Sequence, residues 1–261
     1  MKFPVPGYVR ARARSARIVA LHHCAATVQA IVGQQTLYAY AASQNDAREL
    51  RGRGPAYAVA LPDECGRVVV RHSRRGGLLG RFVHDLYVSR LRPFRELVAS
   101  YRLRSLGVPT PEVVAYVLYS AGPFVRSDVA TREVIGGADL AEWLARNNGA
   151  EVRRAFLEAV AVLLDQLAEA GAHHGDLNAR NILVVQGADG FHAIVLDVDR
   201  VQFHVPRSPV LSEANLARLE RSLRKLQAQG LPVTEQELAM LRAHAAALHA
   251  LRPVTAEEER I

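Results

Sequence analysis

The sequence predicts an α+β fold in two lobes: a strand-rich N-terminal lobe with one helix, then a reduced, helical C-terminal lobe. Up to about residue 132, short runs of β-branched and aromatic residues are separated by glycine and proline turns, which is typical of strands. After residue 139, apolar residues recur every three or four positions, which is typical of helices. Because strands and helices are segregated along the chain, we expect lobes over 1–132 and 133–261.

The N-terminal lobe is expected to consist of short strands around a single helix. The helix is predicted over 93–106, because Pro93 suits a first helical turn and Gly107 a C-terminal cap. Strands are predicted over 17–40, as a hairpin over 51–73 with its turn at 62–66, and over 113–119 and 130–135.

The C-terminal lobe is expected to be mostly helical, with one short strand pair. A helix that ends at Gly171 carries an apolar stripe formed by Val152, Phe156, Val160, Leu163 and Leu167. Two more helices are predicted, one after Ser212 and one from Thr234, whose spacing to Glu237 forms a capping box. Between these helices, the apolar runs on either side of the turn at 187–190 are predicted to pair as a hairpin.

Composition limits the class of protein and its partners. The 261 residues include only two cysteines, Cys24 and Cys65, so neither a disulfide scaffold nor a zinc site is expected, and a reducing cytosol is the simplest compartment. No segment has the pattern of a signal peptide or a transmembrane helix. The net charge is +7, which favours an anionic partner. Nucleic acid is not expected, because no aromatic stacking array or nucleic-acid motif is found.

The segment "HHGDLNARNILVV" at 173–185 carries the clearest chemical pattern. His174, Asp176 and Asn181 form H-x-D-x4-N directly before an apolar strand, and Asp197 ends the second strand of the predicted hairpin. If the two strands pair, Asn181 and Asp197 lie close together. Carboxylate and amide oxygens are ligands that Mg²⁺ prefers, and a carboxylate beside the metal can orient and deprotonate a hydroxyl. The pattern therefore indicates phosphoryl transfer.

These residues resemble the catalytic elements of the protein-kinase superfamily. The resemblance implies a two-lobed protein-kinase-like fold, ATP as the phosphoryl donor, Asp176 as the catalytic base, and Asn181 and Asp197 as Mg²⁺ ligands. Two departures favour a small-molecule or glycan kinase over a protein kinase. Gly175 stands where regulated protein kinases have Arg, and Val198 follows Asp197 where they have Phe.

The resemblance also implies a cation that holds the nucleotide phosphates in the N-terminal lobe. The usual lysine is missing, because the chain has no lysine between Lys2 and Lys225. Arg71 is our candidate, paired with Glu96 on the predicted helix, and Arg67 is the alternative. Gly52 and Gly54 are candidates for a reduced phosphate-binding loop. For Glu96, the alternative to the ion pair with Arg71 is that it is a solvent-exposed helix residue.

Further motifs make the resemblance more specific. The elements "RHSRRGGLLG", "RPFRE" and "GVPTP", together with "HGDLNARNIL" and "LDVDR", resemble the 3-deoxy-D-manno-octulosonic acid (Kdo) kinase branch of the lipopolysaccharide kinase family over about residues 51–203. The resemblance implies ATP-dependent phosphorylation of a Kdo hydroxyl, at the 4-position, in the lipid A inner core. It also implies a peripheral enzyme on the cytoplasmic face of the inner membrane, and no obligate protein partner is evident.

A basic segment could provide the contact with a membrane. Residues 67–104 contain ten arginines and two acids. We hypothesise that Arg74, Arg75 and Arg81 bind phosphates of the Kdo-lipid A substrate or of the anionic membrane surface; the alternative is a solvated basic surface. Two other functions stay open at this stage. One is an aminoglycoside-type phosphotransferase, and the other is a pseudokinase that acts as a binding module.

Overall fold

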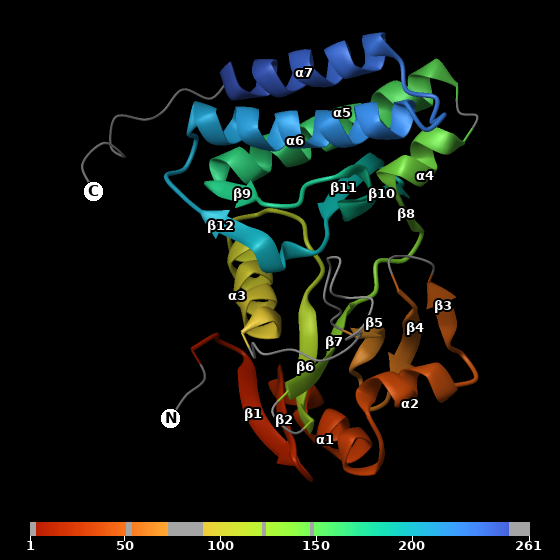
Figure 1. The fold of residues 1–261 in the computed structure, drawn as a ribbon, viewed down its shortest axis with the longest axis vertical. Helices are drawn as coiled ribbons and strands as arrows, with labels where there is room; N and C mark the ends of the chain where they lie inside the picture. The colour runs from red at the N-terminus through yellow and green to blue at the C-terminus, as the bar shows by residue number, and fades with distance from the viewer. Residues whose placement is uncertain (1–3, 51–53, 73–90, 122–123, 147–148, 251–261) are drawn as a thin grey trace. The chain divides into compact units, whose positions relative to one another are not determined.

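A computed structural model describes residues 4–50, 54–72, 91–121, 124–146 and 149–250 (Figure 1). The chain divides into two compact units. Unit 1 comprises Met1–Tyr101 and Pro111–Glu133, and unit 2 comprises Arg102–Thr110 and Val134–Ile261. Among the described residues, no helix is both long and apolar enough to cross a lipid bilayer.

Unit 1 is built on an antiparallel sheet of seven strands in the order β1-β2-β6-β7-β5-β4-β3. The strands are β1 (Tyr8–Ala13), β2 (Ala16–Leu21), β3 (Arg48–Leu50), β4 (Ala56–Leu61), β5 (Gly66–His72), β6 (Val113–Ala121) and β7 (Phe124–Arg132). Val68, Val70, Val117 and Val129 are fully buried on the central strands and form much of the core. The hairpin predicted over 51–73 is present as β4 and β5, whereas β7 lies earlier than the strand predicted over 130–135.

Within the described residues of unit 1, three α-helices accompany this sheet, not the single predicted one. The predicted helix is present as α3 (Arg92–Ser105), but most of the segment predicted as strand over 17–40 forms α1 (Ala25–Gln34) and α2 (Leu37–Ser43). The strand interpretation of 22–40 was therefore wrong. Val28, Ile31 and Val32 bury one side of α1 at helical spacing, and the Thr36 side chain caps α2 by accepting the Ala39 N–H.

Unit 2 is mainly helical, as predicted. Its helices of more than one turn are α4 (Leu140–Ala145), α5 (Ala150–Glu169), α6 (Pro209–Gln227) and α7 (Glu235–Ala250). The predicted hairpin is present as β10 (Ile182–Gly187) and β11 (Gly190–Val195), to which β8 (Gly137–Asp139) adds a third strand. A separate pair joins β9 (Ala172–His174) to β12 (Val201–Phe203). The long helices α5, α6 and α7 lie side by side (Figure 1).

The end of α3 and the loop that follows it, residues 102–110, belong to unit 2, although the sequence analysis assigned them to the N-terminal lobe. Two contacts hold them there. The Arg102 guanidinium lies 4.0 Å from the centre of the Phe203 ring. The Val195 N–H donates to the Pro109 carbonyl oxygen at 2.9 Å, which ties the loop to the end of β11.

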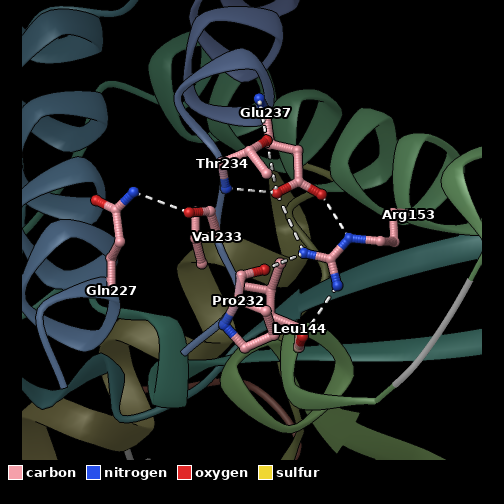
Figure 2. A network of polar contacts seen from close by, with 7 residues as sticks. All are labelled: Leu144, Arg153, Gln227, Pro232, Val233, Thr234 and Glu237. Atoms are coloured by element: carbon pink, nitrogen blue, oxygen red, sulfur yellow. Dashed lines mark hydrogen bonds and ion pairs between the residues drawn. The ribbon is translucent and has the colours of Figure 1, made fainter. Parts of the chain in front are cut away.

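Arg153 fastens α7 to the rest of unit 2 (Figure 2). Its guanidinium donates to both carboxylate oxygens of Glu237, at 2.5 and 3.1 Å, and to the carbonyl oxygens of Leu144 and Pro232. Glu237 also accepts from Thr234, so the predicted capping box is confirmed. Burial raises the pKa of Glu237, but the hydrogen bonds from Arg153 and Thr234 outweigh it, so the net pKa is lowered.

We predict that Arg153→Ala lowers the free energy of unfolding of unit 2 by about 2–4 kcal/mol, because it leaves a mostly buried carboxylate without its partner. Urea unfolding followed by the fluorescence of Trp143, the single tryptophan, measures this change. Arg154→Ala is the matched control. Arg154 forms an exposed ion pair with Glu158, and its loss is expected to cost under about 0.5 kcal/mol. Equal effects of the two variants would contradict this role of Arg153.

Candidate functional site

The loop between β9 and β10, residues 175–181, carries the H-x-D-x4-N residues. His174 is fully buried at the end of β9. Its Nδ1 accepts the Asp176 N–H at 3.2 Å, so Nε2 carries the proton and donates to the Leu196 carbonyl oxygen at 3.0 Å. The imidazole therefore links Asp176 to the residue just before Asp197.

Asn181 and Asp197 are brought together by the β10–β11 hairpin, as predicted. Ile182 pairs with Val195 in the ladder, and one step further the Leu196 N–H donates to the Asn181 carbonyl oxygen at 2.8 Å. Asp197 follows directly and adopts a left-handed conformation with φ 54° and ψ 48°. Aspartate tolerates this conformation better than most residues, and the sharp turn ends the strand at this point.

The glycine at position 175 has a packing reason. A Cβ there would lie 3.1 Å from the carbonyl oxygen of Arg200, the last residue of η4 (Val198–Arg200). A larger residue would therefore require the segments around Gly175 and Arg200 to separate by a few tenths of an ångström. The backbone N–H of Gly175 is turned toward the same oxygen, at 3.4 Å. Close packing of these segments keeps the Asp176 loop next to the Asp197 segment.

The donor set of this loop fits a magnesium ion. The Asn181 Nδ2 donates to the Asp176 carbonyl oxygen at 2.8 Å, which leaves Oδ1 as the amide atom that can coordinate a cation. A carboxylate oxygen of Asp197 would be the second protein ligand. Carboxylate and amide oxygens of this kind suit Mg²⁺, which also keeps waters and substrate phosphates in its coordination shell. Among the described residues, no group of three or more His, Cys, Asp or Glu side chains has metal-binding geometry.

Two polar side chains of α6 support the loop, and the sequence analysis missed both. Asn215 is fully buried; its Oδ1 accepts the His174 N–H at 3.0 Å and its Nδ2 donates to the Ala172 carbonyl oxygen at 2.8 Å. The Ser222 Oγ accepts the Ala179 N–H at 3.2 Å. The only signal in the sequence was a pair of small polar residues, seven positions apart, beside a stripe of leucines.

The candidate nucleotide-binding residues lie in unit 1. The predicted ion pair is present, because Arg71 Nη2 on β5 lies 2.5 Å from Glu96 Oε1 on α3, and Glu96 is buried. The interpretation of Glu96 as an exposed residue is therefore wrong. Arg67 is held by two other carboxylates, those of Glu133 and Asp46, which favours Arg71 as the phosphate-binding cation. That role stays a prediction.

The glycine loop and the basic segment are described only in part. Gly54 is the first residue of its loop that the structure describes, and it lies in a bend before β4. Gly52 lies outside the described residues. The same holds for Arg74, Arg75 and Arg81, the three candidates for phosphate or membrane contact.

Burial lowers the pKa of His174 below its ordinary 6.5, although the hydrogen bond to Leu196 and the charges of Asp176 and Asp197 act in the opposite direction. The folded protein therefore keeps His174 neutral where the unfolded chain already binds a proton. Stability from this group is complete above about pH 6.5 and declines as the pH falls from there toward the lowered folded value.

We predict that the advantage of the wild type over His174→Gln in free energy of unfolding shrinks by at most about 1.4 kcal/mol between pH 7.5 and 5.5. The difference between the two proteins removes the contributions of the other nine histidines, since the chain has ten. Urea unfolding curves at the two pH values give this quantity. A pH-independent difference would show that His174 protonates as readily in the folded protein as in the unfolded chain.

The fold is of the protein-kinase-like class. The solved structure described as "WaaP in complex with acyl carrier protein" matches with a TM-score of 0.52 and 20% sequence identity, covering 86% of each chain. At this identity the likeness concerns the fold, and it confirms the predicted two-lobed class.

Sequence comparisons identify the family. The sequence model of the lipopolysaccharide kinase (Kdo/WaaP) family matches residues 39–244. The chain is 33% identical over 183 residues to the 3-deoxy-D-manno-octulosonic acid kinase of Stenotrophomonas maltophilia (strain K279a), covering 68% of this chain and 69% of that protein. It is 32% identical over 188 residues to the protein of the same name from Xylella fastidiosa (strain 9a5c), with the same coverage. The chain belongs to the lipopolysaccharide kinase (Kdo/WaaP) family, and it is a kinase.

Proposed function

We propose that this kinase transfers the γ-phosphoryl group of ATP to the 4-hydroxyl of a Kdo residue in the lipid A inner core, as a step of lipopolysaccharide synthesis. The observation that carries the proposal is the family match over residues 39–244, together with relatives of at least 30% identity that are named Kdo kinases. The H-x-D-x4-N loop and Asp197, which unit 2 brings together, supply the chemistry that such a reaction needs.

In unit 2, we assign the role of catalytic base to Asp176. Its carboxylate orients the acceptor hydroxyl and accepts the proton of that hydroxyl as the new phosphorus–oxygen bond forms. Asn181 and Asp197 hold Mg²⁺, which neutralises charge on the nucleotide phosphates when it is bound. The buried His174 and Asn215 fix the backbone around Asp176 through hydrogen bonds. Most of the catalysis of phosphoryl transfer comes from positioning the reacting groups. A loop that is held in place by these hydrogen bonds keeps Asp176 in position for that purpose.

In unit 1, we assign the binding of the nucleotide phosphates to Arg71, and Glu96 holds its guanidinium in place. The ion pair is short and Glu96 is buried, so the guanidinium has a defined position before nucleotide binds. Gly52 and Gly54 let backbone N–H groups approach the phosphates. Arginine replaces the more usual lysine here, and its planar fork suits phosphate oxygens well.

We also propose that the enzyme is peripheral, on the cytoplasmic face of the inner membrane, and that Arg74, Arg75 and Arg81 bind lipid phosphates. The support is the density of arginines in this segment and the lipid-borne acceptor. Binding to vesicles that contain anionic phospholipid should fall steeply between 50 and 300 mM salt, because the Debye length shortens from above about 10 Å to below about 8 Å over this range. Unchanged binding of Arg74→Ala/Arg75→Ala would remove these residues from the membrane contact.

The function is tested by offering ATP, Mg²⁺ and three acceptors in parallel: Kdo-bearing lipid A, free Kdo and an aminoglycoside. We expect phosphate on the Kdo-bearing acceptor, with a phosphorus coupling to the proton at C4 in the NMR spectrum of the product. Phosphorylation of the aminoglycoside alone would replace this proposal with the aminoglycoside-type phosphotransferase. Nucleotide binding without transfer to any of the acceptors would also contradict it.

A further inference from the structure

Two valines are highly exposed on unit 2, where the chain passes from β12 into α6 (Figure 1). Val205 is 75% exposed and Val210 is 76% exposed, more than any other large apolar side chain that the structure describes. Pro206 and Pro209, which lie between them in the chain, are exposed as well. Apolar side chains in water lose the free energy that burial provides, so a cluster of them within one short segment indicates a surface that binds an apolar phase.

The backbone of this segment is held against the end of α5. The His204 N–H donates to the Gly171 carbonyl oxygen, and the Arg207 N–H donates to the Ala168 carbonyl oxygen, each at 2.8 Å. The two prolines have no N–H that needs an acceptor. Few backbone donors are therefore left open, which suits a place that contains little water. The valines are thus exposed on a fixed support.

Helix α6 continues from this segment with a basic stripe on its solvent side. Leu219 and Leu223 are buried on the opposite side of the helix. Residues three or four apart share a face of a helix, and the stripe away from the leucines comprises Val210, Ala214, Arg218, Arg221 and Lys225.

The stripe contains no acid. The two acids of α6, Glu220 and Glu213, both act on Arg242 of α7. Glu220 raises the pKa of Arg242 through a hydrogen-bonded ion pair, and Glu213 raises it further through its charge. Both acids are therefore engaged with α7 and do not neutralise the stripe.

The exposed cations of the stripe, Arg221 and Lys225, have no ion-pair partner within the part of the chain that the structure describes. Arg224 on the same helix differs, because it pairs with Glu235 at 2.8 Å. A stripe of cations without acids is complementary to a surface that carries fixed negative charge. Cations beside exposed apolar side chains are typical of segments that bind at the interface of an anionic membrane. Nucleic acid would use the cations, but phosphate contacts leave valine and proline in water.

We propose that Val205, Val210, Arg221 and Lys225 form a docking surface for an anionic lipid bilayer. The valines enter the boundary between headgroups and acyl chains, and the cations contact headgroup phosphates. The inference rests on the proposed function, in which the acceptor is carried by a lipid, and it names the place where unit 2 meets that lipid.

The docking surface is connected to the loop that carries Asp176. The segment with Val205 follows β12, and β12 pairs with β9. The Asp176 loop leaves this strand pair at its other end, and β9 is only three residues long, about 10 Å. Docking at this place therefore keeps the Asp176 loop close to the lipid that carries the acceptor.

Co-sedimentation with vesicles of phosphatidylglycerol and phosphatidylcholine tests the docking surface. Val205→Ser/Val210→Ser should bind about 5–30-fold more weakly than the wild type at both about 50 and about 300 mM salt, because salt does not screen an apolar contact. Arg221→Gln/Lys225→Gln should bind about 10–30-fold more weakly at the lower salt concentration and nearly like the wild type at the higher one. Vesicles of phosphatidylcholine alone should bind the wild type more weakly than the anionic vesicles do.

Two double variants elsewhere on unit 2 are the matched controls. Val152→Ser/Val162→Ser removes two exposed valines of α5, and Arg146→Gln/Arg154→Gln removes two positive charges from exposed ion pairs. Both should bind vesicles within about twofold of the wild type. Equal losses in the controls and in the docking-surface variants would overturn the inference, and so would unchanged binding of either docking-surface variant. A changed oligomeric state with unchanged vesicle binding would assign the surface to a second copy of the chain instead.

Turnover of a water-soluble Kdo glycoside separates this inference from the proposed reaction. Both docking-surface variants should keep the wild-type kcat and KM for the glycoside and show a raised KM for Kdo-bearing lipid A in anionic vesicles. An equal loss of turnover with both acceptors would overturn the docking role. A wild type that phosphorylates the glycoside but binds no vesicles would overturn the inference and leave the reaction in place. A wild type that binds vesicles through this surface but phosphorylates neither acceptor would overturn the proposed reaction alone.

Discussion

Asp176→Asn is expected to lower the rate of phosphoryl transfer by about 10²–10⁴-fold, the range that general acid–base catalysis contributes. The amide keeps the size of the side chain but cannot accept the proton of the acceptor hydroxyl. The backbone contacts of the loop do not depend on the carboxylate. The Asp176 N–H donates to the His174 imidazole, and the Asp176 carbonyl oxygen accepts from the side chains of Asn178 and Asn181. The variant should therefore fold normally.

The affinity for ATP should be nearly unchanged in Asp176→Asn, because Asp176 is assigned to the acceptor and not to the nucleotide. Rates measured under single-turnover conditions separate the transfer step from product release. Asn178→Ala serves as the control in the same loop. Asn178 binds the backbone of Asp176 and Arg180 and caps η3 (Ala179–Asn181), and its one contact with the Asp176 carboxylate is long, at 3.5 Å. Its loss should therefore cost some stability and little transfer. Transfer by Asp176→Asn at more than a tenth of the wild-type rate would remove Asp176 from the role of base.

Arg71→Gln is expected to weaken ATP binding by about 10–100-fold, because a hydrogen bond between charged groups is worth about 1.5–3 kcal/mol. Glu96→Gln should have a smaller effect of the same kind, since the guanidinium stays but loses the carboxylate that positions it. The two substitutions should not be additive, because both act through one ion pair. Titration calorimetry with a non-hydrolysable ATP analogue measures each affinity.

Arg67→Gln is the matched control for Arg71→Gln. Arg67 lies on the same strand but binds Glu133 and Asp46, so we expect its loss to affect the stability of unit 1 and not the affinity for nucleotide. If Arg67→Gln weakened ATP binding more than Arg71→Gln, the assignment of the two arginines would have to be exchanged.

The arrangement of the H-x-D-x4-N loop beside Asp197 could be predicted from the sequence because its pattern is local. His174, Asp176 and Asn181 lie within eight residues, and the hairpin that brings in Asp197 follows at once, so one turn connects the whole set. The Arg71–Glu96 pair could also be predicted, because the lack of lysine required an arginine and Arg71 ends the strand that precedes the predicted helix. In both cases short-range pattern and elementary chemistry agreed with the tertiary structure.

Other parts depend on contacts that no local pattern reveals. Asn215 supports the loop from a helix some forty positions further along the chain, and a single buried polar residue in a leucine-rich helix has many possible reasons. The segment at 22–40 was taken for strands because Tyr and β-branched residues have high strand propensity. Packing of Val28, Ile31 and Val32 into the core of unit 1 decided in favour of helix.

The account is tested most directly by incubating the wild-type protein with ATP, Mg²⁺ and lipid A that carries or lacks Kdo, and measuring the mass of the lipid. The account predicts one added phosphate on the Kdo-bearing lipid, no addition without Mg²⁺, and no addition to the lipid that lacks Kdo. Two results would contradict the proposed function. One is a phosphate added to the lipid that lacks Kdo, and the other is no phosphate added to either lipid although the protein binds ATP.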